Sequence, residues 1–166
     1  MYLPWLLYME DVRWLKAMLS KELEVRPPVS DKKEAECLAG KCVKIYRNEK
    51  IIGFAEMRKV GSHIEISTVL IDPEYRNQGV GKELIDIAIG QITNERILCC
   101  TKNPAMAKVL QNLKFNSIGW PGFWTAAVLL FNTFARLVSM LIRFEFKRIW
   151  RQGKGLHKYE RYELEK

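Results

Sequence analysis

The stretch that decides the fold covers residues 72–81 and reads Asp-Pro-Glu-Tyr-Arg-Asn-Gln-Gly-Val-Gly. It follows nine residues rich in β-branched types (63–71) and leads directly into an amphipathic helix with apolar positions Leu84, Ile85, Ala88, Ile89 and Ile92. Because Gly79 and Gly81 have no Cβ, consecutive backbone N–H groups can converge on one anion, and the helix dipole adds to the attraction for phosphate. A glycine pair in a turn is more often structural, but its position between a strand and a helix favours a phosphate-binding loop.

The segments on either side of this loop alternate between helix and strand patterns. Apolar periodicity predicts helices from about Asp11, over 31–38 and over 103–113. Short β-branched or alternating runs predict strands at 2–8, 42–46, 51–57, 63–71 and 96–101. This order predicts an α/β fold with a mixed (α+β) sheet.

The charge of the chain points to an anionic partner. The 166 residues fit one domain and carry a net charge of +8. That balance suits nucleic acid, a membrane surface or a phosphorylated cofactor. Basic and aromatic residues interleave over 143–151, but no recognition motif accompanies them, so we do not expect nucleic acid as a partner.

The cysteines and histidines give no sign of a metal site. Cys37, Cys42, Cys99 and Cys100 form no C-x-x-C pair, and His63 and His157 lack ligand spacing. The first residues lack the basic region and cleavage site of a signal peptide. We therefore expect no metal, reduced thiols and a cytoplasmic location, with peripheral membrane contact left open.

The loop and three further features resemble one family. Arg76-x-x-Gly79-x-Gly81 resembles the acetyl-CoA loop of the GNAT N-acetyltransferase superfamily, whose core is Arg/Gln-x-x-Gly-x-Gly/Ala. Residues 48–55 resemble the family's second hairpin, and Asn103 stands twelve residues before Phe115, the family's spacing from a cofactor-contacting Asn to a Phe. The order of elements from residue 1 to about 118 is also similar.

This resemblance implies acetyl-CoA as co-substrate and a set of cofactor-binding residues. In the family, backbone N–H groups of the loop hold the pyrophosphate, and the preceding strand pairs with the pantetheine arm. The thioester then lies where strands 63–71 and 96–101 splay apart. The residues implied are Leu70, Ile71, Arg76, Asn77, Gln78, Gly79, Val80, Gly81, Lys82 and Asn103.

Acetyl transfer to an amine benefits from a general base, because a lysine-like ammonium has a pKa of about 10.4. Glu65 lies eleven residues before Arg76, which resembles the catalytic Glu of the histone-acetyltransferase branch. We predict Glu65 as the base, acting through water, with His63 as second choice. An ordinary solvated strand residue is the alternative for Glu65.

The general acid is less clear. The family's usual Tyr is replaced by Leu110, and the usual Gly before Phe115 is Lys114. Because a thiol is a fair leaving group, turnover does not require that acid. Cys100, Ser67 and Tyr159 are substitutes among which the sequence does not select. Buried strand cysteines are commonly part of the core, so we do not expect a covalent role for Cys99 or Cys100.

The last third of the chain is unusually apolar. Residues 115–135 carry no charge, and we expect one helix over 123–151 with a narrow polar stripe: Thr125, Asn132, Arg136, Ser139, Arg143 and Lys147. Its apolar side is covered by the domain or a second copy, lies on a membrane, or spans one. We divide the single domain into a core (1–118), a helical insertion (119–155) and a last strand (156–166).

We therefore predict a GNAT-like N-acetyltransferase that moves an acetyl group from acetyl-CoA directly to a primary amine on a small molecule or peptide. The alternative is a non-catalytic CoA-binding module, or a membrane- or partner-associated module, on a degenerate GNAT fold. The insertion would shape the acceptor site, dimerise the protein or bring it to a membrane. The sequence does not identify the acceptor.

Overall fold

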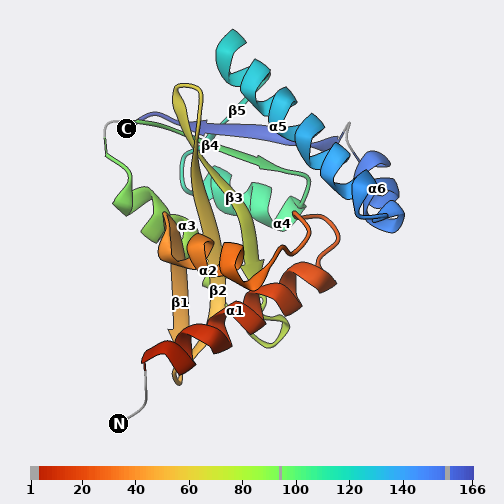
Figure 1. Ribbon diagram of the computed structural model, residues 1–166. Helices are drawn as coiled ribbons and strands as arrows, with labels where there is room; N and C mark the ends of the chain where they lie inside the picture. Colours follow the sequence, from red (N-terminus) through yellow and green to blue (C-terminus); the bar gives the residue numbers. More distant parts are fainter. Residues whose placement is uncertain (1–3, 94, 156–157) are drawn as a thin grey trace.

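The protein is a six-stranded mixed sheet with helices on both faces (Figure 1). The computed structural model describes residues 4–93, 95–155 and 158–166, so His157 lies outside the described residues. The strand order is β1-β2-β3-β4-β6-β5. The strands are β1 (Cys42–Arg47), β2 (Lys50–Val60), β3 (His63–Ile71), β4 (Arg96–Thr101), β5 (Asn116–Ile118) and β6 (Glu160–Leu164). The helices are α1 (Pro4–Lys21), α2 (Asp31–Ala39), the 3-10 turn η1 (Pro73–Tyr75), α3 (Val80–Gln91), α4 (Pro104–Asn112), α5 (Phe123–Ile142) and α6 (Phe146–Gly153).

The sheet is antiparallel except at one junction. β1, β2 and β3 form consecutive antiparallel pairs, whereas β3 and β4 run parallel because α3 crosses over between them. β6 lies between β4 and β5 and is antiparallel to both. The mixed α/β sheet expected from the sequence is confirmed, and the final strand at 160–164 lies within the segment assigned to it.

The strand predicted at residues 2–8 is wrong. Within the described residues, α1 already begins at Pro4 and continues without a break to Lys21. Pro4 occupies the first turn, where its missing N–H costs nothing and its fixed φ suits a helix. A short apolar run does not distinguish a strand from a buried helix, which explains the error.

Each face of the sheet has its own apolar core. α3 and α4 cover one face and pack against inward residues of all the central strands, including Ile64, Ile97 and Tyr162. α1 and α2 cover the other face around Phe54 and Leu70. α5 lies over the same face as α1 and α2. Its Thr125 bonds to His63, and His63 points to the opposite face from its neighbour Ile64, which packs in the core under α3 and α4.

The long helix expected over 123–151 is two helices. α5 ends where Phe144 adopts a φ of +55° and the N–H of Glu145 bonds to the carbonyl of Met140 at 2.9 Å. This six-to-one bond around a left-handed residue is the Schellman ending of a helix. A phenylalanine in the left-handed position gives no sequence signal, so the break was not foreseeable.

α6 is fixed to the end of α1 by polar side chains. The guanidinium of Arg148 is only 3% exposed and donates to the carbonyl of Leu19 at 2.9 Å and to those of Glu22 and Val25, also at 2.9 Å. The amide of Gln152 donates to the carbonyl of Leu23 at 2.8 Å. The carbonyl of Leu19 belongs to the last turn of α1, and those of Glu22, Leu23 and Val25 follow it, so α6 is bonded to the C-terminal turn of α1 and to the segment after it.

Candidate active site

The loop after β3 presents free N–H groups at the start of α3. The Asp72 carboxylate accepts from the N–H of Glu74 at 3.1 Å and from the Trp14 indole at 3.1 Å, which fixes the entry to the loop. Asn77 (φ +62°) and Gly79 (φ +85°) adopt left-handed backbone, and α3 begins at Val80. The first N–H groups of a helix have no intrahelical partners, so this end can bind an anion.

The glycines of the loop serve two different purposes. A Cβ at Gly79 would meet nothing within 4 Å, so glycine is favoured at this position by the positive φ and not by lack of space. A Cβ at Gly81 would lie 3.1 Å from Cδ1 of Ile71, so Gly81 lets α3 approach the end of β3 closely. The anion-binding turn therefore lies directly beside the C-terminal end of that strand.

Side chains of the loop mostly hold the loop itself. The Arg76 guanidinium pairs with Glu22 at the end of α1, and the Gln78 amide donates to the carbonyl of Glu74 at 2.7 Å. Lys82 pairs with Asp86 one turn along α3. The backbone N–H groups of this loop, rather than these side chains, are therefore available to bind a phosphate group.

β3 and β4 separate partway along their length. Their parallel pairing covers only three positions and ends at Glu65 opposite Leu98. Beyond this point Thr68 has a φ of +50°, and the register with β2 shifts between Phe54 and Glu56, which marks a bulge in β3. Among the described residues, no strand pairs with the β4-facing edge of β3 after Glu65, so that edge has backbone groups available to a ligand.

Glu65 lies at the point of separation and is largely buried. Its side chain is 7% exposed, and its Oε2 accepts from Nε of Arg58 at 2.7 Å. Arg58 is the residue opposite Glu65 in the antiparallel register of β2 and β3. Among the described residues, no hydrogen bond to Oε1 of Glu65 is recorded, so this atom is left to accept a proton.

His63 uses both ring nitrogens within the protein. Nε2 lies 2.7 Å from Oε1 of Glu163, and Nδ1 lies 3.1 Å from the hydroxyls of both Ser62 and Thr125. The ring is buried and joins β3, β6 and the start of α5. This bonding leaves no free nitrogen for a substrate proton, whereas Glu65 keeps one oxygen.

The residues considered for the acid or nucleophile have different environments. Leu110 is fully buried in the core on the α3 face. Burial raises the pKa of Cys100 to about 12 and raises that of Cys99 as well. Both thiols are therefore neutral near pH 7, which argues against a thiolate nucleophile. Burial also raises the pKa of Tyr159.

Two polar atoms near Glu65 are buried without partners. Oγ of Ser67, two residues along β3, and Nε of Arg136 on α5 have no hydrogen-bond partner among the described residues. Burial lowers the pKa of Arg136, and Glu65 and Arg58 both act on it electrostatically. The sequence places Arg136 in the polar stripe of its helix and gives no sign of its electrostatic interaction with Glu65.

Asn103 lies at the far end of β4, where it begins α4. Its Oδ1 caps the helix by accepting from the N–H of Ala105 at 2.9 Å. A depression beside it is lined by Lys102, Pro104, Ala107, Lys108, Gln111, Lys158, Glu160 and Tyr162. The structure thus brings the loop, the open edge of β3 and Glu65 together, with Asn103 at the end of the neighbouring strand.

No cluster of metal-ligating residues is found among the described residues.

A mixed sheet splays beside a glycine turn in this protein, and a comparison with protein families identifies its class. The model of the acetyltransferase (GNAT) family matches residues 8–115, more than half of the chain. The chain therefore belongs to the GNAT family of N-acetyltransferases, as the resemblance of its loop predicted. No curated protein matches it significantly in sequence.

Solved structures share the fold at low sequence identity. A Mycobacterium tuberculosis protein in complex with CoA is similar over 95% of both chains, with a TM-score of 0.62 and 16% identity. Phosphinothricin acetyltransferase of Sinorhizobium meliloti, in complex with acetyl-CoA, is similar over 70% of this chain and 79% of its own (TM-score 0.57, 16% identity). The ribosomal-protein-S18-alanine N-acetyltransferase of Escherichia coli is similar over 66% and 74% (TM-score 0.53, 20% identity). These likenesses confirm the GNAT fold.

Proposed function

We propose that this protein transfers the acetyl group of acetyl-CoA directly to a primary amine, with Glu65 as the base. The observation that carries the proposal is the coincidence of two features: β3 and β4 separate after Glu65, and the anion-binding turn lies at the end of the open edge. A thioester held along that edge, with its pyrophosphate at the start of α3, would have its carbonyl near Glu65.

The reaction needs one base and no covalent intermediate. The amine nitrogen attacks the thioester carbonyl carbon, the C–N bond forms, and the C–S bond breaks with loss of the thiolate of CoA. The nitrogen loses its proton to Oε1 of Glu65, through water, and the thiolate takes up a proton from solvent. Because thiols have a pKa near 8.5, the thiolate can leave without protonation by a general acid. Leu110 occupies the position at which the family usually has a Tyr for that purpose.

The environment of Arg136 supports a proposal about the chemical class of the acceptor. Arg136 is half-buried, its Nε has no hydrogen-bond partner among the described residues, and burial lowers its pKa, so a negative group on the substrate would stabilise its charge. We therefore propose an amine that also carries a carboxylate or phosphate as acceptor. α5 would shape the acceptor site through this residue, as expected for the insertion.

Calorimetric titration of acetyl-CoA tests the cofactor site. We expect micromolar binding to the wild type and loss of binding in Gly81→Asp, which adds a side chain and a negative charge at the start of α3. Gly90→Asp is the matched control, because a Cβ at Gly90 on the same helix meets nothing within 4 Å. Equal binding in wild type and Gly81→Asp would contradict the site.

Thiol release from acetyl-CoA against a panel of amines tests the reaction. Glu65→Gln should lower kcat by about 100-fold and leave the Kd of acetyl-CoA unchanged. Arg136→Gln should raise the KM of acidic amines relative to neutral ones. Tight acetyl-CoA binding without turnover on any amine would favour the non-catalytic module.

A further inference from the structure

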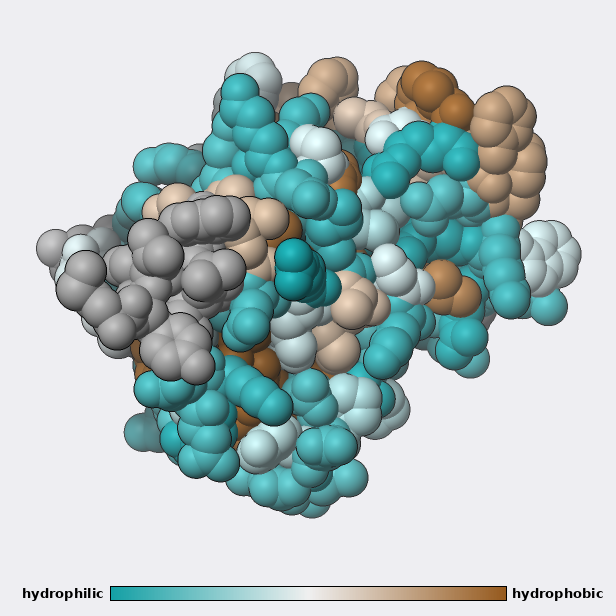
Figure 2. All heavy atoms as spheres, turned by 60° about the horizontal axis from the view of Figure 1, so that its bottom comes forward, coloured by the Kyte–Doolittle hydropathy of each residue, from teal (hydrophilic) through white to brown (hydrophobic). Residues whose placement is uncertain are grey.

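The α5–α6 segment exposes a continuous set of apolar side chains. Eleven of the fourteen exposed large hydrophobic residues in the described parts of the chain lie on it. We call this surface the outer apolar face; it consists of Phe123, Trp124, Leu130, Phe131, Phe134, Val138, Leu141, Ile142, Phe144, Phe146 and Trp150. In Figure 2 brown and tan residues lie at the upper right edge of the molecule, next to teal residues. A monomer in water rarely shows a patch of this size without a partner for it.

The outer apolar face is held outward by contacts on the opposite side of the segment. Thr125 bonds to His63, and a Cβ at Gly61 would lie 2.5 Å from the Thr125 hydroxyl, so α5 begins in direct contact with the β2–β3 turn. Arg148 and Gln152 satisfy the end of α1. Rolling the segment over to bury its phenylalanines would break all of these bonds and leave buried polar groups unpaired.

Exposed basic residues lie at the α6 end of this apolar surface. Residues 123–154 contain six Lys or Arg and one acidic residue, Glu145. Arg143, Lys147, Arg151 and Lys154 are exposed, and the Lys154 ammonium lies 4.7 Å from the centre of the exposed Trp150 ring. A second copy docked through this face would bring like charges together, whereas anionic headgroups would neutralise them.

We propose that the outer apolar face docks onto an anionic membrane surface. α5 and α6 lie in the plane of the interface, with their phenylalanines among the acyl chains and their exposed lysines and arginines at the headgroups. The two tryptophans, Trp124 and Trp150, are of the type that prefers this interface. This proposal is independent of the proposed acetyl transfer.

α5 is also long and apolar enough to span a membrane by length and composition, and 11% of that span is buried. Spanning would require α5 to leave the sheet, because Thr125 contacts His63 and the buried Met140 packs inward near its other end. Arg136 on the inward side would then enter the hydrocarbon unpaired. Interfacial docking keeps every one of these contacts.

Co-sedimentation with vesicles tests the proposal. The full-length protein is mixed with equimolar phosphatidylglycerol/phosphatidylcholine vesicles and with pure phosphatidylcholine vesicles. We expect at least about tenfold stronger partition onto the anionic vesicles, falling when NaCl is raised to about 0.5 M. Tryptophan emission should shift to the blue on the anionic vesicles only.

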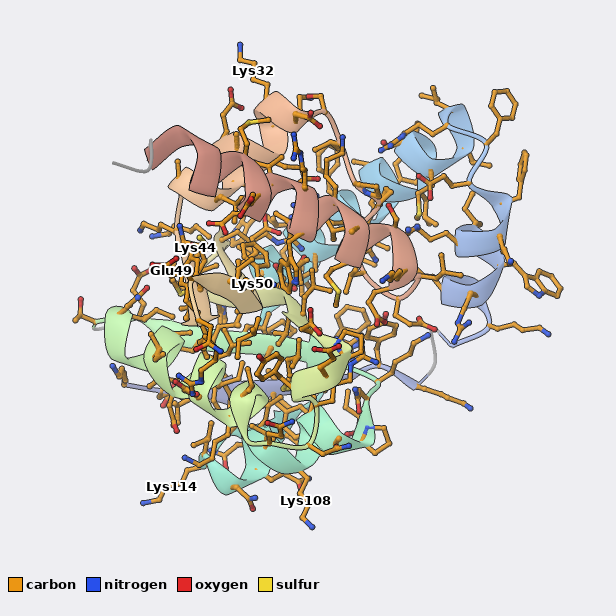
Figure 3. The ribbon with its side chains drawn as sticks, turned by 90° about the horizontal axis from the view of Figure 1, so that it is seen from below. Lys32, Lys44, Glu49, Lys50, Lys108 and Lys114 are labelled. Carbon is orange, nitrogen blue, oxygen red and sulfur yellow. The ribbon has the colours of Figure 1, made fainter. Side chains whose placement is uncertain are left out.

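Two pairs of variants separate the apolar and the charged contributions. Phe131→Gln with Phe134→Gln should lower partition at least about tenfold, and Ile87→Gln, an exposed apolar residue on α3, should leave it unchanged. The double variant Lys147→Glu with Lys154→Glu should lower partition onto anionic vesicles about as much as the phenylalanine variant does. Lys32→Glu with Lys114→Glu is the charge-matched control, since both lysines point away from the α5–α6 segment in Figure 3.

Because Phe131 and Phe134 are 70% and 66% exposed, their replacement should leave the circular dichroism spectrum and the melting temperature unchanged. Three outcomes would overturn the proposal: no partition of the wild type onto anionic vesicles, equal partition of the phenylalanine variant, or resistance of bound protein to alkaline carbonate extraction, which indicates a span. A lipid-free dimer that the phenylalanine variant dissociates, without vesicle binding, would assign the face to a second copy.

Discussion

α3 and α5 cover opposite faces of one sheet with opposite orientations of their side chains. α3 turns Leu84, Ile85 and Ala88 towards the sheet and its charged residues to solvent. α5 turns Thr125 and Arg136 towards the sheet and Phe131 and Phe134 away from it. An amphipathic pattern therefore specifies that one side of a helix is apolar, and the surroundings decide where that side points.

The largest difference in stability is expected between two variants, each of which truncates one apolar side chain on one of these helices. Leu84→Ala removes a fully buried side chain from the core and should lower the free energy of unfolding by about 2–5 kcal/mol. Phe134→Ala should change it by less than about 0.5 kcal/mol, because the ring is already in water. Urea denaturation measures both, and a large loss in Phe134→Ala would show that α5 buries its apolar side in solution.

The polar attachment of α6 should matter almost as much. Arg148→Ala removes the donor to the carbonyls of Leu19, Glu22 and Val25 and should cost about 3 kcal/mol. Arg151→Ala, whose ion pair with Glu24 is largely exposed, should cost less than about 1 kcal/mol. Similar denaturation midpoints for the two variants would mean that α6 is not held by its inward side.

A smaller change of the opposite sign is expected at Arg136. Arg136→Met keeps an unbranched side chain and removes a half-buried cation that has an unpaired Nε, so it should stabilise the protein by about 1 kcal/mol. Lys147→Met, an exposed change on α6, is the control and should be neutral. Destabilisation by Arg136→Met would indicate a partner for this guanidinium within the protein.

The smallest effect is a dependence of stability on pH above neutrality. Burial raises the pKa of Cys99 on the α3 side of the sheet, so the folded state keeps its proton while the unfolded thiol ionises near pH 8.5. The folded state binds more protons, and stability therefore falls as the pH rises. Between pH 7 and 9 we expect Cys99 to contribute less than about 1 kcal/mol to this decline, measured by urea denaturation as the difference between the wild type and Cys99→Ala.

The loop and its strand were predictable because their signals are local. Glycines at a strand–helix junction specify the backbone of the turn, and two-residue alternation in β3 places His63 and Glu65 on one face. The ion pair of Glu65 with Arg58 was also within reach, since the turn at Gly61 and Ser62 sets the register of the hairpin. No sequence signal joins Arg136 to that site, because α5 reaches it only through the path of the whole chain.

Errors arose where one pattern fits two structures. The apolar residues at the start of α1 fit a strand as well as a helix. The helical wheel placed Thr125 and Arg136 in one polar stripe but did not indicate that Thr125 packs against the β2–β3 turn. Ser139, Arg143 and Lys147 of the same stripe are exposed. Polar inward contacts such as those of Thr125 and Arg148 join residues more than sixty positions apart, so periodicity within one segment does not reveal them.

The place of β6 in the sheet has a consequence for the order of events during synthesis. β6 follows β4 and β5 in the sequence, yet it lies between them in the sheet, so these three strands cannot pair until residues 160–164 have left the ribosome. Both of its neighbours, and α5 and α6, are translated before it. The apolar side chains of α5 are thus presented to the surroundings of the ribosome while the strand that completes the sheet is still being made.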